Sequence, residues 1–124
     1  MRVLVVDDNA DVLLSINALL EGAGYESETA SDARRAIEIH RRRPADVVIT
    51  DIFMPDQDGL ETIVKFRTEW PGVKIVAMSG GGDIAKQDYL QVAQHAGADA
   101  MLRKPFEPEE LLRTVNRLTR GADG

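Results

Sequence analysis

The chain has 124 residues, of which 44% are apolar, and this length and composition suit one domain with one hydrophobic core. It contains no cysteine, which excludes disulfides and thiolate metal sites, and its apolar runs are far shorter than the ~18 residues that a membrane span needs. Its net charge of −6 argues against binding to a nucleic-acid backbone, so we expect a cytoplasmic protein that contacts neither nucleic acid nor membrane.

Short aliphatic segments alternate with amphipathic ones along the chain. Three of the five aliphatic segments are nearly continuous apolar runs, which is typical of parallel strands covered by helices on both faces. The pattern indicates five successive strand–helix units and predicts an α/β fold, a doubly wound domain with a five-stranded parallel sheet. The predicted strands span residues 3–6, 26–29, 47–50, 74–78 and 99–102.

The helices between these strands carry start and stop residues. Asn9 is the candidate N-cap of the first helix, which ends near Gly22. Ser31 is the candidate cap of the second helix, and the arginines at 41–43 are interpreted as its solvated end, where cations suit the negative end of the helix dipole. Asp58 and Glu61 resemble a capping box at the start of the third helix, Asp83 is expected to start the fourth, and Pro108 is expected to be the first residue of the fifth.

Polar side chains follow four of the predicted strands. Asp7 and Asp8 follow the first strand, Asp51 the third, Ser79 the fourth and Lys104 the fifth. Ligands of such folds bind outside the carboxyl ends of the strands, where these residues gather. Three carboxylates without thiols or imidazoles form an all-oxygen site, which suits Mg²⁺ because this ion takes few protein oxygens and keeps several waters.

Four sequence blocks carry a family resemblance, each at a strand end: VLVVDDN, VVITDIFMPDQDG, MSG and LRKPF. With these blocks the chain resembles a response regulator receiver domain of two-component signalling, similar to the single-domain chemotaxis regulators. The resemblance covers essentially the whole chain. It implies a flavodoxin-like sheet with strand order 2-1-3-4-5 and a single receiver domain over residues 1–124, with no output domain in this chain.

The resemblance also assigns roles to individual residues. Asp51 matches the phosphoacceptor, and Asp7 and Asp8 match acids that bind or orient Mg²⁺, together with Asp51 itself. The remaining ligand is the backbone carbonyl of Phe53. Ser79 matches the switch hydroxyl, and Lys104 matches the lysine that contacts the phosphoryl oxygens, followed by a bond to Pro105 that is cis in the family. The implied function is a phosphorylation-dependent switch rather than an enzyme, with a sensor histidine kinase or a histidine phosphotransfer protein as donor and an unknown protein as target.

The roles also follow from chemistry, because phosphoryl transfer needs an in-line nucleophile and positive charge around the equatorial oxygens. A carboxylate, Mg²⁺, an ammonium and a hydroxyl supply these needs. One departure from the family pattern is Met101, which occupies a position that is usually aromatic in the family. Phe53 and Gly81 match the positions that flank the path of the hydrolytic water in the family, and neither has a polar side chain. We therefore expect slow hydrolysis of the phosphorylated protein.

Three other possibilities remain open at this point. A haloacid dehalogenase-type phosphatase also combines Mg²⁺, aspartate and lysine to act on small phosphate esters, but it needs a DxD motif on its first strand. A flavodoxin-like binding module needs a Ser/Thr- and Gly-rich turn after the first strand, where this chain has DDNAD. Acids at that turn would repel a flavin phosphate. The chain could also be the first part of a longer regulator.

Overall fold

The computed structural model describes residues 1–54, 57–79, 91 and 93–120. Five parallel strands form the main sheet, in the order β2-β1-β3-β6-β7. Since β6 and β7 are the fourth and fifth strands of that sheet, the predicted order 2-1-3-4-5 is confirmed. The strands are β1 (Arg2–Val6), β2 (Glu26–Ala30), β3 (Val47–Asp51), β6 (Lys74–Ser79) and β7 (Ala100–Arg103).

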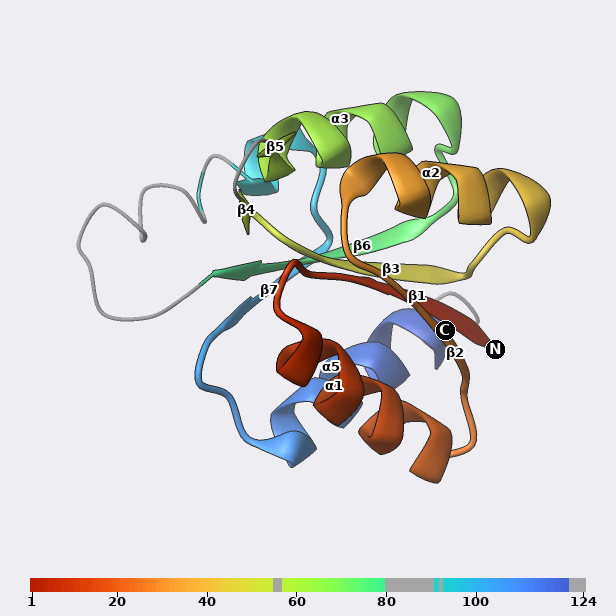
Figure 1. Cartoon of the computed structure of the whole chain (residues 1–124), viewed down its shortest axis with the longest axis vertical. Coiled ribbons are helices and arrows are strands. Elements are labelled where there is room, and N and C mark those ends of the chain that lie inside the picture. The colour runs from red at the N-terminus through yellow and green to blue at the C-terminus, as the bar shows by residue number, and fades with distance from the viewer. Residues whose placement is uncertain (55–56, 80–90, 92, 121–124) are drawn as a thin grey trace.

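Helices cover both faces of the sheet, so the domain is doubly wound. In Figure 1, α1 and α5 lie on one side of the sheet and α2 and α3 on the other. The described helices are α1 (Ala10–Gly22), α2 (Ala33–Arg42), α3 (Gly59–Glu69) and α5 (Pro108–Arg120). None of the helices in the described part of the chain is long and apolar enough to cross a membrane.

The caps of the first two helices differ in how well the sequence predicts them. The Asn9 side chain caps α1 by accepting hydrogen bonds from the backbone N–H groups of Asp11 and Val12, as expected. The predicted cap of α2 is wrong, because Asp32 and not Ser31 accepts from the Arg35 N–H, at 2.8 Å. The helix begins at Ala33, so Asp32 stands three residues before that N–H, the spacing that an N-cap requires, whereas Ser31 is one residue too early.

The arginines at the end of α2 lie on the surface, as the sequence predicts. Arg43 pairs with Glu26 of β2 at 2.9 Å, and Arg41 pairs with Glu69 of α3 at 3.2 Å. All four side chains are at least about one-third exposed, and such pairs contribute little to stability because solvent screens them.

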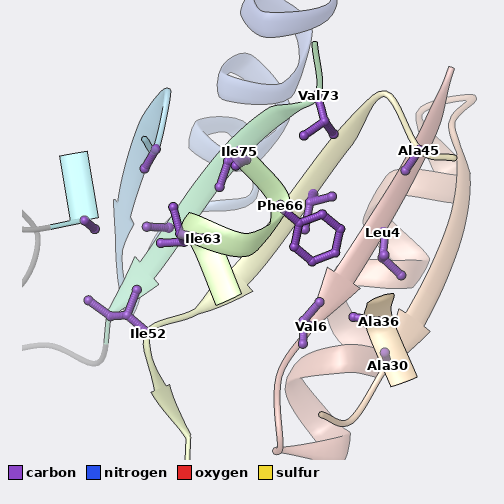
Figure 2. Packing of buried hydrophobic residues seen from close by; sticks show 14 residues of the cluster. Leu4, Val6, Ala30, Ala36, Ala45, Ile52, Ile63, Phe66, Val73 and Ile75 are labelled. Carbon is purple, nitrogen blue, oxygen red and sulfur yellow. The ribbon is translucent and has the colours of Figure 1, made fainter. Parts of the chain in front are cut away.

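The sheet separates two hydrophobic clusters. Because successive side chains of a strand point to opposite faces, Leu4 and Val6 of β1 belong to the cluster under α2 and α3, whereas Val3 and Val5 belong to the one under α1 and α5. Figure 2 shows part of the first cluster, with the Phe66 ring of α3 on the same side of the sheet as Leu4 and Val6. This packing holds the carboxyl ends of the central strands in place from both sides.

One pair of strands was not predicted from the sequence, and one predicted helix start lies outside the described residues. A two-stranded antiparallel pair, β4 (Phe53–Met54) and β5 (Gln57–Asp58), follows β3 and was not predicted. This pair forms a separate two-stranded sheet and does not extend the main one. The predicted start of the fourth helix at Asp83 lies outside the described residues, and so does Gly81.

Candidate functional site

The predicted site residues gather at one edge of the sheet because its strands are parallel. Val6 of β1 pairs in register with Thr50 of β3, and Asp51 pairs with Met78 of β6. Asp7 therefore leaves β1 where Asp51 ends β3, and Ser79 ends β6 one residue further on. Lys104 directly follows β7, the fifth strand of the sheet.

Three carboxylates form the centre of the site. Asp7, Asp8 and Asp51 each offer an oxygen, and these atoms lie within 4.8 Å of one another. Asp7 and Asp51 are buried and Asp8 is exposed, so the cluster has one side open to solvent. Two buried carboxylates this close repel each other unless a cation lies between them. The all-oxygen donor set fits a hard divalent cation and not a thiophilic metal.

Lys104 supplies a positive charge between two of these acids. Its Nζ donates to Asp7 Oδ2 at 2.6 Å and to Asp51 Oδ2 at 2.8 Å. Burial of the ammonium works to lower the pKa of Lys104, but the hydrogen bonds to Asp51 and Asp7 outweigh it and the net pKa is raised above its ordinary value. The lysine therefore carries its proton at neutral pH and partly neutralises the acid pair.

Backbone N–H groups hold Asp7 and Ser79 in place at this edge of the sheet. The second carboxylate oxygen of Asp7, Oδ1, accepts from the Asn9 N–H at 2.9 Å, so both oxygens of Asp7 are engaged. The backbone N–H of Lys104 donates to the Ser79 carbonyl at 2.7 Å, which ties the lysine to the end of β6. The Lys104–Pro105 peptide bond is cis, as the resemblance implies.

The Ser79 hydroxyl is the unusual polar atom of the site. It is buried, yet its Oγ has no hydrogen-bond partner among the described residues. A buried hydroxyl without a partner costs free energy, which a bound oxyanion would recover by accepting a hydrogen bond from it. This orphaned donor, on the strand end to which Lys104 is bonded, suits an anion bound at this edge of the sheet.

The remaining predicted residues are described only in part. Phe53 lies two residues after Asp51, at the start of β4, but its side chain lies outside the description, so the predicted effect of its ring on hydrolysis stays a prediction. Met101 of β7 is half-buried and packs against the cluster under α2 and α3. The sequence predicts that Lys104 faces the acids, and the structure adds that the lysine bonds to Asp7 as well as to Asp51, across 97 positions of the chain.

The sequence matches the model of one protein family over residues 3–116, that of the response regulator receiver domain. The chain belongs to this family. It is 32% identical over 120 residues to the chemotaxis protein CheY of Thermotoga maritima, covering 96% of this chain and 98% of that protein. It is 33% identical to the transcriptional regulatory protein PhoP of Escherichia coli O157:H7, covering all of this chain but 54% of PhoP, so the chain spans about half of that relative.

Solved structures agree with this membership. The chemotaxis protein CheY4 of Vibrio cholerae, crystallised at low pH, superposes with a TM-score of 0.84 at 34% identity, covering 94% of this chain and 97% of that one. A receiver domain protein of Clostridium thermocellum superposes with a TM-score of 0.89 at 31% identity, covering 98% of this receiver and 96% of that chain. The receiver is therefore a phosphorylation-dependent signalling switch of the CheY-like fold.

Proposed function

We propose that Asp51 is the residue of this receiver that accepts the phosphoryl group, from a phosphohistidine of a sensor histidine kinase or a histidine phosphotransfer protein. The observation that carries the proposal is the hydrogen bond of the buried Asp51 carboxylate to Lys104 inside a cluster of three acids. Asp7 is equally buried in the same cluster and contacts the same ammonium at 2.6 Å. The choice of Asp51 over Asp7 therefore rests on its match to the phosphoacceptor position of the family, at the end of β3.

In the proposed reaction, a carboxylate oxygen of Asp51 attacks the phosphorus in line with the nitrogen–phosphorus bond. That bond breaks, the electron pair stays on the imidazole nitrogen, and an acyl phosphate forms on Asp51. The negative charge on the equatorial oxygens must be neutralised as the phosphoryl group is transferred. Lys104 does so by turning its ammonium from Asp51 Oδ2 to a phosphoryl oxygen, and the Ser79 hydroxyl donates a hydrogen bond to another.

The metal part of the proposal concerns Mg²⁺. Asp7, Asp8 and Asp51 would hold it through carboxylate oxygens, and Phe53 through its backbone carbonyl. When bound, Mg²⁺ adds positive charge at the transferring phosphoryl group. The three acids would keep the ion at this edge of the sheet, with Asp8 contacting it from the exposed side of the cluster.

The switch follows from the bonds that phosphorylation replaces. Lys104 is attached to Ser79 through its backbone N–H and to Asp7 and Asp51 through its ammonium. When the ammonium and the Ser79 hydroxyl both turn toward one phosphoryl group, Lys104 and the residues that follow β7 move relative to β1 and β3. The changed surface then alters binding of a downstream protein.

Mass spectrometry tests the assignment. The protein incubated with acetyl phosphate and Mg²⁺ is expected to gain the mass of one phosphoryl group, and Asp51→Asn is expected to gain none. Asp11→Asn is the matched control, because Asp11 is an exposed acid in the first turn of α1 and no part of the acid cluster. Stoichiometric phosphorylation of Asp51→Asn would show that another residue is the acceptor.

A further inference from the structure

His40 is a titratable residue that the signalling site does not use. It lies in the last turn of α2, at the amino edge of the sheet and thus at the opposite end from the acids, and its exposed fraction is 1%. Its ring stands edge-on to two aromatic rings of the α3 region, with centroids 4.5 Å from Trp70 and 5.2 Å from Phe66. Histidines are seldom this completely buried, and a buried ring must keep its polar atoms bonded.

The hydrogen bond of His40 fixes its protonation state. Nδ1 accepts from the backbone N–H of Ala45 at 3.1 Å, and Ala45 lies two residues before the start of β3. An accepting ring nitrogen carries no proton, so the imidazole is neutral with its hydrogen on Nε2. Protonation of Nδ1 would remove the acceptor, place two N–H groups against each other and leave a buried charge among aromatic rings.

The charges around the ring oppose its protonation. Arg2 of β1 acts on it from the sheet side, and Arg41 and Arg43 follow it in the chain. The acids on the neighbouring elements are already engaged: Glu69 of α3 pairs with Arg41, and the Asp46 carboxylate accepts from the Arg2 backbone N–H. Burial, and after it the charge of Arg2, lower the pKa of His40 below its ordinary value.

We propose that His40 is an acid-sensitive latch that holds the C-terminal turn of α2 against α3 and the entry of β3 while its ring is neutral. In the unfolded chain the imidazole takes up its proton near its ordinary pKa of about 6.5. In the native protein it does so only at lower pH. Stability that the latch provides is therefore complete above about pH 6.5 and falls as the pH decreases from there to the native pKa of His40.

The first test is an NMR titration of both histidines in the unphosphorylated native protein, together with hydrogen exchange of the Ala45 amide. We expect the midpoint of His40 to lie below about 6.5. The Ala45 amide should lose protection as the pH falls through that midpoint. Fluorescence of Trp70, the single tryptophan, should change over the same range. A His40 midpoint at or above the ordinary value, or an Ala45 amide whose protection does not follow it, would overturn the proposal.

The second test compares pH profiles of urea unfolding for variants. His40→Asn places an amide oxygen near the position of Nδ1, so it can accept from Ala45 but cannot titrate. His95→Asn is the matched control, because His95 is the other histidine and its side chain is exposed. From pH 7.5 to 5.0 the wild-type protein and His95→Asn should lose stability more steeply than His40→Asn. Equal slopes for all three proteins would refute the latch.

Discussion

Replacing Lys104 with methionine removes the ammonium while keeping a flexible side chain of similar length. Two buried carboxylates then face each other, because the Asp7 and Asp51 side chains are 1% and 8% exposed and the lysine contacts both. Breaking a fully buried pair costs about 3–5 kcal/mol. The Lys104 side chain is 21% exposed, so solvent screens part of this interaction. For the metal-free protein we expect a loss of roughly 2–3 kcal/mol in the free energy of unfolding.

Urea unfolding in EDTA and in excess Mg²⁺ measures this loss. Since the divalent ion supplies the positive charge that the variant lacks, Mg²⁺ should stabilise Lys104→Met more than it stabilises the wild-type protein. Lys65→Met is the control, because Lys65 is exposed on α3, and its stability should stay within about 0.5 kcal/mol of wild type. Adding Asp7→Asn to Lys104→Met should recover part of the loss. Equal stability of Lys104→Met and wild type in EDTA would refute the role of the lysine as counter-charge.

Three further predictions concern other residues. Asp8→Ala should weaken Mg²⁺ binding in a calorimetric titration without destabilising the metal-free fold, because one repelling acid is gone; an unchanged affinity would count against the metal site. Phe53→Asn should speed the decay of the phosphorylated protein, since an amide can orient the attacking water, and a decay rate that is unchanged or slower would contradict this. Phe66→Ala should cost about 3–5 kcal/mol in urea unfolding, as the ring is 1% exposed, and a loss below 1 kcal/mol would show that the cluster closes over the gap.

The sequence predicts the sheet well because buried parallel strands have an unmistakable composition. The run from Val47 to Asp51 is buried at every position, so its apolar stretch marks the strand almost to the residue. Cap positions are harder, since Ser31 and Asp32 are both good N-caps and only the start of α2 decides between them. The β4–β5 pair was missed because each of its strands has two residues, too few for any periodicity to appear.

For the site, too, the sequence predicts where single residues lie along the chain better than it predicts which residues contact each other. The sequence places the acids, Ser79 and Lys104 at strand ends, but it does not show that the lysine lies between Asp7 and Asp51, since this depends on the packing of β7 beside β6. The burial of His40 had a signal that could have been used. Ala36 and His40 are four residues apart and thus on one helix face, which makes the histidine part of the buried stripe of α2.

The alternation of the central strands between two clusters has a mechanical consequence. Leu4 and Val6 of β1 pack into the cluster on one face of the sheet, and Val3 and Val5 pack into the cluster on the other face. The side chains of β3 and β6 are divided between the two clusters in the same way. A close-packed interior has low compressibility, so these strands are expected to be rigid where they support Asp7 and Asp51. The groups of this site that can move are those outside the packed strands, such as the Lys104 side chain. If Asp51 is the phosphoacceptor, as proposed above, its signal should pass through Lys104 and the residues that follow β7, and not through the packed core.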